Sequence, residues 1–171
     1  LGRDPMTGTT LFQARNVERA RVYGAEIGFH ADLDGWLAGL AFDAAASWTR
    51  GDNRTSHQPL NTIDPAELIA ALTWQPNEQS RFALTTTSAA GQDRVDDSLA
   101  DPFTTDGYTA VDLTASYTTR RGLRVDFGVF NLFDETYWRW SAVRNRASDD
   151  PLINLLSAPG RYASVSVHLE I

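Results

Sequence analysis

The stretch Leu123-Arg-Val-Asp-Phe-Gly-Val-Phe130 alternates apolar residues with polar or small ones. A period of two places successive side chains on opposite faces of a β-strand, so this stretch is predicted to be a strand with one apolar and one polar face. Six further segments alternate in the same way, and together the segments predict an all-β antiparallel meander of about seven long strands. The six segments cover residues 23–33, 36–49, 68–74, 82–88, 111–117 and 163–171.

The connections between the predicted strands are short and long in strict alternation. In an antiparallel meander, this alternation puts tight turns at one end of the sheet and large loops at the other. Transmembrane barrels of the outer membrane have this asymmetry, with short periplasmic turns and longer extracellular loops. The short connections cover residues 32–35, 75–80 and 118–122, and the long ones cover 50–65, 90–107 and 134–160.

Two solvents are compatible with a two-faced strand pattern. A soluble sandwich or lipocalin-like barrel would bury its apolar faces in a closed core, whereas a membrane barrel would turn them toward lipid. The predicted strand length of roughly 10–14 residues exceeds the usual 5–6 and favours the membrane barrel. Trp36 and Trp74 beside short turns, and Trp48 beside a long loop, suit the aromatic girdles that flank a membrane-facing band.

Composition excludes several classes of function. All 15 basic residues are Arg and they are outnumbered by 22 acidic ones, giving a net charge of −7, which argues against a nucleic-acid partner. Without Cys there is neither a disulfide framework nor a cysteine-based metal site. No segment approaches the roughly 20 apolar residues of a membrane helix. Neither a G-x-S-x-G nor an H-E-x-x-H motif is present, so no catalytic or metal site is predicted.

Several segments, in order along the chain, resemble motifs of the TonB-dependent outer-membrane receptors. The resemblance implies that residues 1–171 form the C-terminal segment of a 22-stranded transmembrane β-barrel, with the plug domain and the N-terminal strands outside this chain. It also implies a location in the outer membrane of a Gram-negative bacterium, and contact with outer-membrane lipid. The segments are Asn16-Val-Glu-Arg-Ala-Arg-Val-Tyr-Gly-Ala-Glu26, Pro59-Leu-Asn-Thr-Ile-Asp-Pro65, Gly107-Tyr-Thr-Ala-Val-Asp-Leu113, Val129-Phe-Asn-Leu-Phe-Asp134 and Ala158-Pro-Gly-Arg161.

Within that family, two loops are similar to those of the haem and haemoglobin (transferrin/lactoferrin-type) receptors. They contain Gln92-Asp-Arg-Val-Asp-Asp-Ser98 and Tyr137-Trp-Arg-Trp-Ser-Ala-Val-Arg144. The resemblance implies uptake of haem, or of haem iron from haemoglobin-type proteins, with haem as the transported ligand rather than a covalently bound cofactor. Coupling to TonB would run through an N-terminal segment that is not in this chain. A ferric-siderophore receptor and a soluble β-sandwich binding module are the alternatives.

The resemblance points to candidate ligand-binding residues in the long loops. His57 is the only histidine outside the predicted strands and could ligate haem iron, although an exposed polar role is the simpler alternative. Aromatic residues and Arg near the start of the last long loop could contact haemoglobin or haem propionates, or could pack into a loop core with Arg–acid pairs. These loop candidates are Tyr137, Trp138, Trp140 and Arg144.

The polar faces of the strands predict a second set of residues, which would line a watery lumen. Charged residues there could form an ion-pair network that helps to seat the absent plug domain. His30 and His168 lie on the same faces and are predicted to form hydrogen bonds in the lumen. The charged members are Glu26, Asp112, Arg124, Asp126 and Glu170.

Overall fold

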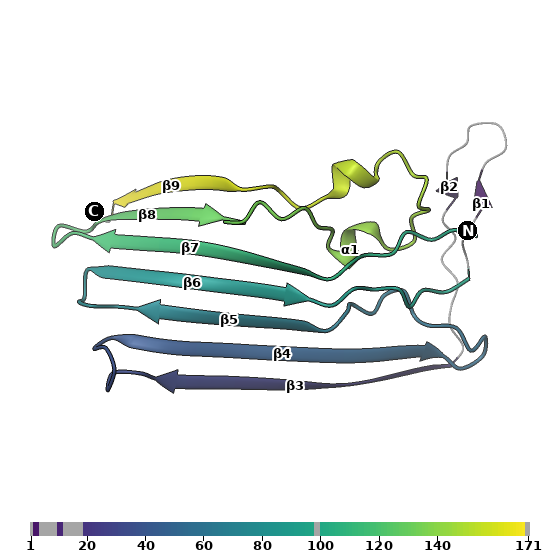
Figure 1. The fold of residues 1–171 in the computed structure, drawn as a ribbon, viewed down its shortest axis with the longest axis horizontal. Helices are drawn as coiled ribbons and strands as arrows, with labels where there is room; N and C mark the ends of the chain where they lie inside the picture. Colours follow the sequence, from purple (N-terminus) through teal and green to yellow (C-terminus); the bar gives the residue numbers. More distant parts are fainter. Residues whose placement is uncertain (1, 4–9, 12–18, 98–99, 170–171) are drawn as a thin grey trace.

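The computed structural model describes residues 2–3, 10–11, 19–97 and 100–169. It contains one seven-stranded sheet in which every strand pairs antiparallel with its sequence neighbours, in the order β3 to β9 (Figure 1). The predicted all-β meander is confirmed. Its strands are β3 (Ala20–Asp32), β4 (Leu40–Asn53), β5 (Glu67–Trp74), β6 (Ser80–Ala89), β7 (Tyr108–Thr118), β8 (Leu123–Phe130) and β9 (Tyr162–Leu169).

A short hairpin of β1 (Gly2–Arg3) and β2 (Thr10–Leu11) precedes the large sheet. Sequence alternation did not predict it, since two-residue strands are too short to show a period. The three short turns lie at one end of the sheet, while the three long loops gather at the other (Figure 1). The predicted asymmetry between the two ends is therefore confirmed.

The pairing register aligns the apolar faces of all seven strands on one side of the sheet. Ile27 lies opposite Ala46 across β3 and β4, and Leu84 lies opposite Leu113 across β6 and β7. The next pair along the sheet, Phe127 opposite Val165, continues the same face. Because side chains alternate strictly, the polar residues between them must all lie on the other face.

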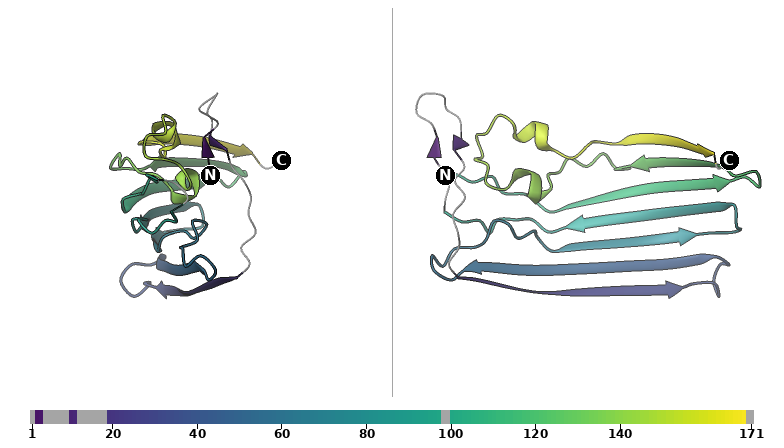
Figure 2. Two further views of the ribbon diagram at one scale, coloured as in Figure 1. Left: turned by 90° about the vertical axis from the view of Figure 1, so that its right-hand side faces the viewer. Right: turned by 180° about the vertical axis from the view of Figure 1, so that it is seen from behind.

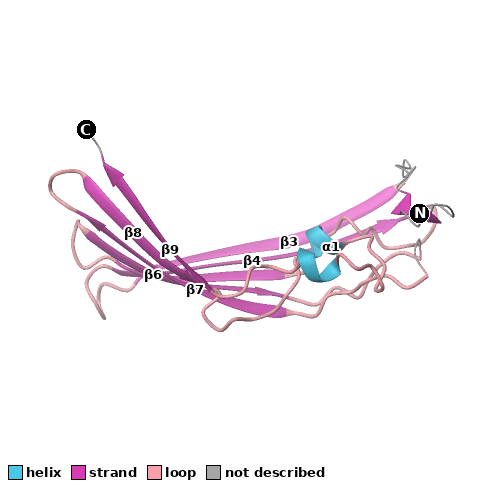
Figure 3. Cartoon of the chain, turned by 90° about the horizontal axis from the view of Figure 1, so that it is seen from above, coloured by secondary structure: helices cyan, strands magenta, loops and turns pink. Residues whose placement is uncertain are grey.

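The described chain forms a single-layered sheet that is bowed and twisted, with neither broad face covered by a second layer (Figures 2 and 3). Apolar side chains on the aligned face are correspondingly open: Phe29 is 59% exposed, Phe127 44% and Val167 63%. The closed apolar centre of a soluble sandwich is therefore not formed by these strands. An exposed apolar surface of this extent marks contact with lipid or a protein partner.

Most strand boundaries differ from the prediction by a few residues, and the largest shift is in β4, which covers Leu40–Asn53 instead of residues 36–49. β4 begins at Leu40 rather than at Trp36, because residues 33–39 form the turn that follows β3. Gly39 has a φ of +77°, which is not a strand conformation, so β4 can begin only after it. The N–H of Gly39 donates to Asp34 Oδ1 at 2.7 Å within the turn. Trp36 is 87% exposed in this turn. Strand lengths also span a wider range than predicted, from 8 residues in β5, β8 and β9 to 14 in β4.

The aromatic residues at the two strand ends form pairs on the apolar face. At the turn end, Trp74 stacks on Phe82 with ring centroids 5.5 Å apart, and its Nε1 donates to the carbonyl oxygen of Ala38 at 3.2 Å. At the loop end, Tyr23 meets Trp48 edge to face at 5.8 Å. The predicted placement of Trp48 and Trp74 near opposite ends of the band is confirmed.

Two short helical turns, α1 (Trp140–Val143) and the 3₁₀ turn η1 (Ile153–Leu156), lie in the last long loop. Within the described residues, no helix has the length and apolar character needed to cross a membrane.

Exchanging one residue on each face of β6 tests the assignment of the two faces. In the receptor that contains this chain, Leu84→Arg should lower the free energy of unfolding by about 2–4 kcal/mol, because a charge near the bilayer midplane faces lipid. The neighbouring Thr85→Arg, on the polar face opposite Asp112, should cost less than about 1 kcal/mol. Guanidinium titration in lipid vesicles measures both, and equal costs would contradict the assignment.

Candidate functional site: the loop cluster and the mouth of the lumen

The turn that follows β8 is held by a single buried side chain, that of Asn131. Its Nδ2 donates to the carbonyl oxygens of Glu135 at 2.8 Å and Pro159 at 3.1 Å, and its Oδ1 accepts the N–H of Glu135 at 2.9 Å. The Asn131 N–H donates to Asp112 Oδ1 at 2.8 Å. Asn131 has a φ of +51°, a conformation that Asn tolerates better than most residues. The side-chain amide of Asn131 thus joins the two ends of the β8–β9 loop, and its backbone N–H joins them to β7.

Asp134 completes this closure three residues later. Its carboxylate accepts the backbone N–H of Arg161 at 2.7 Å, just before β9 begins. A Cβ at Gly160 would come within 2.9 Å of the Asp134 carboxylate, so the absence of a side chain there permits the approach. The loop of residues 131–161 therefore leaves and re-enters the wall at nearly one place.

The described parts of the three long loops, residues 54–66, 90–107 and 131–161, pack into one unit that we call the loop cluster. Its centre is Trp140, which is only 3% exposed, with Val143 and Ile153 beside it. The indole Nε1 of Trp140 donates to the carbonyl oxygen of Asn61 at 2.8 Å and so joins the third loop to the first. Partly buried residues surround this centre: Val95, Phe103, Trp138 and Leu156.

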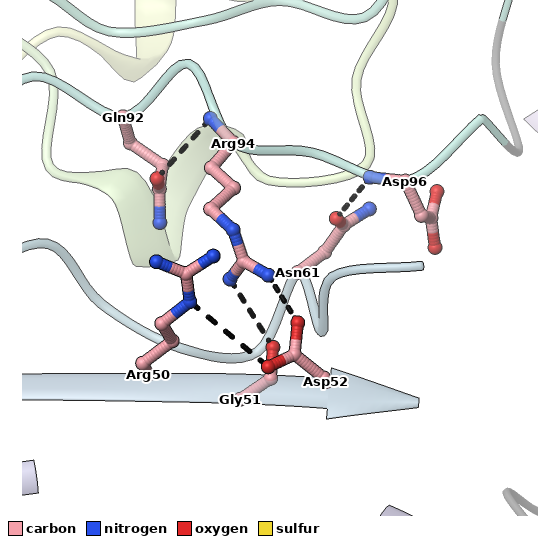
Figure 4. A network of polar contacts seen from close by, with 7 residues as sticks. All are labelled: Arg50, Gly51, Asp52, Asn61, Gln92, Arg94 and Asp96. Carbon is pink, nitrogen blue, oxygen red and sulfur yellow. Dashed lines mark hydrogen bonds and ion pairs between the residues drawn. The ribbon is translucent and has the colours of Figure 1, made fainter. Parts of the chain in front are cut away.

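A polar network ties the cluster to the end of β4 (Figure 4). Arg94, from the second loop, forms an ion pair with Asp52, and its Nη1 donates to the carbonyl oxygen of Gly51 at 3.3 Å. Asn61 accepts the N–H of Asp96 at 2.8 Å, and its Nδ2 donates to Asn145 in the third loop at 2.8 Å. Each loop therefore has direct hydrogen bonds to another, which makes the cluster one packed body.

The third loop leans over the polar face of the sheet and encloses a cavity of about 460 Å³, which we call the mouth cavity. Its floor comes from polar-face residues near the strand ends, such as Glu67 and Tyr108, and its roof from Trp138 and Arg139. Tyr137 stacks on Tyr108 with ring centroids 3.9 Å apart, which fixes the loop against the wall. The cavity opens where a lumen would meet the outside.

The structure separates the five predicted ligand-binding residues. Trp138 lines the mouth cavity, and its Nε1 donates to the carbonyl oxygen of Ile153 at 2.8 Å. Tyr137 does not line the cavity but stacks on Tyr108, which does. Trp140 contributes only a small part of the cavity wall because its ring lies in the cluster core, as the self-packed alternative anticipates. His57 and Arg144 do not line the cavity. His57 is exposed in a tight turn, with a φ of +59°.

Arg139 was not among the predicted ligand-binding residues, yet it is the cation that lines the mouth cavity. Its side chain is exposed and makes no hydrogen bond or ion pair within the described part of the chain. Its position between Trp138 and Trp140 could have identified it from the sequence, because Trp, Tyr and Arg are enriched at binding hot spots. The Arg–acid pairing predicted for this loop includes the ion pair between Arg146 and Asp150 at 2.9 Å.

The predicted lumen residues do not form one network. Near the turn end, Arg124 Nε donates to Asp126 Oδ1 at 2.9 Å, and His168 lies 3.5 Å from the other oxygen of Asp126. His30 belongs to a separate group, 2.7 Å from Asp43 and 3.3 Å from Asp32.

The remaining members of the predicted network are dispersed. Asp112 lies at the loop end, where it holds the Asn131 N–H. Glu26 lies opposite Ser47 and, among the described residues, has no ion-pair partner. Glu170 lies outside the described residues. All the described members share the polar face, as predicted, but the distances divide them into local groups, and a role in seating a plug stays a prediction.

The fold is that of an open barrel wall with one apolar face, one polar face and long loops at one end. Residues 1–132 match the family described as "TonB dependent receptor-like, beta-barrel", so the chain belongs to this family. Its homologues are outer-membrane β-barrel proteins of Gram-negative bacteria, in agreement with the predicted location. The family consists of transport receptors rather than enzymes.

Curated relatives include iron receptors of different specificity. The chain is 29% identical over 122 residues to the ferric aerobactin receptor of Escherichia coli, covering 70% of this chain and 16% of that protein. It is also 29% identical over 156 residues to the "Probable hemoglobin and hemoglobin-haptoglobin-binding protein 4" of Haemophilus influenzae, covering 79% and 15%. The chain thus spans about a sixth of the length of these relatives.

Solved structures of similar fold include the copper transporter OprC, with a TM-score of 0.74 at 22% identity, covering 89% of this chain and 24% of that one. A mutant of the ferric enterobactin receptor PfeA of Pseudomonas aeruginosa has a TM-score of 0.67 at 21% identity, covering 90% and 23%. At these identities the matches establish the fold and leave the ligand open.

Removing the centre of the loop cluster should loosen the loops without disturbing the wall. Trp140→Ala should destabilise the cluster by about 3–5 kcal/mol, because a buried indole and its hydrogen bond to Asn61 are lost together. Hydrogen exchange on the whole receptor should then speed up in residues 54–66, 90–97 and 131–161. Trp36→Ala, at an exposed turn position, is the matched control. Unchanged loop protection in Trp140→Ala would show that the cluster does not depend on this core.

Proposed function

We propose that the receptor containing this chain takes up haem, or haem iron from haemoglobin-type proteins, across the outer membrane. In this proposal the chain supplies part of the wall of a 22-stranded barrel and three loops that receive the ligand. Energy enters through TonB by way of a segment outside this chain. The observation that carries the proposal is the mouth cavity, where the third loop places aromatic rings and an exposed Arg over the polar face.

The part of the mouth cavity that the third loop supplies suits a flat ligand with anionic groups, such as haem, while the rest of the lining includes the acids Asp64 and Glu67. Aromatic faces such as the ring of Trp138 offer stacking surface to a planar macrocycle. The guanidinium of Arg139 can bind a propionate with two parallel hydrogen bonds. The cavity volume of about 460 Å³ falls in the usual range for small-molecule sites. The haemoglobin-binding relative supports the same ligand class.

A ferric siderophore is the second candidate. The match to ferric aerobactin receptors of two enterobacteria favours it, as does the fold shared with a ferric enterobactin receptor. Through Arg139 and its aromatic rings, the mouth cavity could receive a negatively charged iron chelate as well as haem, although its lining also includes the carboxylates of Asp64 and Glu67. The two candidates therefore differ in ligand and share the site.

Growth on defined iron sources separates the candidates. A strain that carries this receptor as its only TonB-dependent iron receptor is supplied with haemoglobin or with ferric aerobactin as sole iron source. The proposal expects growth on haemoglobin. Growth on ferric aerobactin alone would transfer the assignment to a siderophore receptor. Growth on neither source would overturn the haem assignment and exclude aerobactin as the siderophore.

Arg139→Ala should weaken ligand binding to the whole receptor about 10- to 100-fold, because a charge-assisted hydrogen bond of about 1.5–3 kcal/mol is removed. Arg121→Ala, which removes an exposed cation from the β7–β8 turn at the other end of the wall, is the matched control. Binding is measured by titration of haemin into the purified receptor. An equal effect of the two substitutions would place the ligand away from the mouth cavity.

A further inference from the structure

The apolar face of the wall is not uniformly smooth. Near the loop end it contains a depression of about 540 Å³, which we call the alanine groove. Its floor is formed by Ala25 and Ala46, and the larger side chains of Ile27, Trp48 and Leu68 rise around them. The register places these residues side by side, with Ala25 opposite Trp48 and Ala46 flanked by Ile27 and Leu68. The groove spans strands β3 to β6 and is lined overwhelmingly by apolar surface.

Two cations, Arg21 and Arg50, lie beyond the end of the groove nearer the loops. The alternation of side chains places both on the apolar face. The Arg21 guanidinium lies 4.9 Å from the centre of the Tyr23 ring. Tyr23 is directly opposite Arg50 on β4. Arg and aromatic residues at the end of an apolar band suit the head-group level of a bilayer. There the aliphatic part of an Arg side chain can lie against apolar surface while its guanidinium group stays in the polar region.

The charge at this edge is positive after local pairing. Arg50 Nε is 4.0 Å from Asp52 Oδ2, and Arg94 from the second loop holds the other oxygen of the same carboxylate (Figure 4). One acid is thus shared by two Arg residues, and Arg21 forms no ion pair within the described part of the chain. A phosphate would complement this edge, because guanidinium groups bind its oxygens in pairs.

The distance between cations and groove fits a lipid. Arg21 precedes Ala25 by four residues and Arg50 follows Ala46 by four, which is about 13 Å along a strand. Long loops of such barrels are extracellular, so the cations lie at the outer surface and the groove lies in the outer leaflet. A phosphate at the cations would therefore place the start of an acyl chain over the alanine floor.

We infer that the alanine groove and the cations Arg21 and Arg50 bind a phosphate-bearing, multi-acylated glycolipid of the outer leaflet. The phosphate contacts the two guanidinium groups, and an acyl chain fills the groove between Ile27, Trp48 and Leu68. The small floor residues are what make room for the chain. This binding rests on membership of the family and on the wall itself, and it is independent of which iron source the receptor takes up.

Native mass spectrometry of the whole receptor, incubated in detergent with bisphosphorylated lipid A, tests the inference. The wild type should retain lipid A at least about 10-fold better than dephosphorylated lipid A, because two Arg–phosphate contacts are lost with the phosphates. The double substitution Arg21→Gln/Arg50→Gln should abolish that preference. Equal retention of both lipids by the wild type, or an unchanged preference in the double variant, would overturn the inference.

Filling the groove tests the acyl contact separately. Ala46→Phe should lower lipid A retention about as much as the Arg substitutions, because its ring occupies the floor of the groove. Ala115→Phe is the matched control, since it enlarges an alanine on the same face of β7, between Phe82 and Phe127 and outside the groove. Heat-modifiable gel mobility verifies that each barrel is folded. If Ala46→Phe does not fold, the Arg pair decides alone. Equal retention by the two folded alanine variants would overturn the acyl contact.

Discussion

The ladder of antiparallel backbone hydrogen bonds determines the rest of this structure. In a bilayer, no water can satisfy an unpaired N–H or C=O group, so a spanning segment must satisfy its own backbone or pair it with a neighbour. From β3 to β9 the ladder does this without interruption between neighbouring strands. It also fixes the register, and a shift by one residue would turn every apolar side chain toward the lumen. The backbone hydrogen bonds therefore also determine which face of the sheet meets lipid and which meets the lumen.

The wall and the loop cluster are stabilised by different forces. Within the described residues, the wall has almost no buried apolar side chain, because lipid and lumen water take the place of a core; Ala110 is its exception. The loops extend beyond the apolar band and must bury their own side chains, which they do around Trp140. Asn131 and Asp134 join the two regions by returning the longest loop to its starting point. The mouth cavity exists because this loop is held over the lumen rather than away from it.

Much of the wall could be predicted from the sequence, because alternation is a local signal. The seven strands and their faces follow from it, and Phe127, Val165 and Leu113 lie on the predicted side. The start of β4 could not be located this way, since Trp36 and Leu40 keep the apolar period through a turn. The contacts between the loops could not be predicted because they join residues far apart in the sequence. Trp140 bonds to Asn61, 79 residues earlier, and no local pattern distinguishes this buried indole from Trp138 at the cavity.

The most direct test of the account is the solvent that each face of the wall meets. Spin labels on single cysteines along β7, in a receptor with no other cysteine, report collision with dissolved oxygen in lipid or with a water-soluble nickel complex. The account predicts that labels at Leu113 and Ala115 respond to oxygen, and that labels at Thr114 and Ser116 respond to nickel. Nickel accessibility at Leu113 and Ala115, with oxygen accessibility at Thr114 and Ser116, would contradict it.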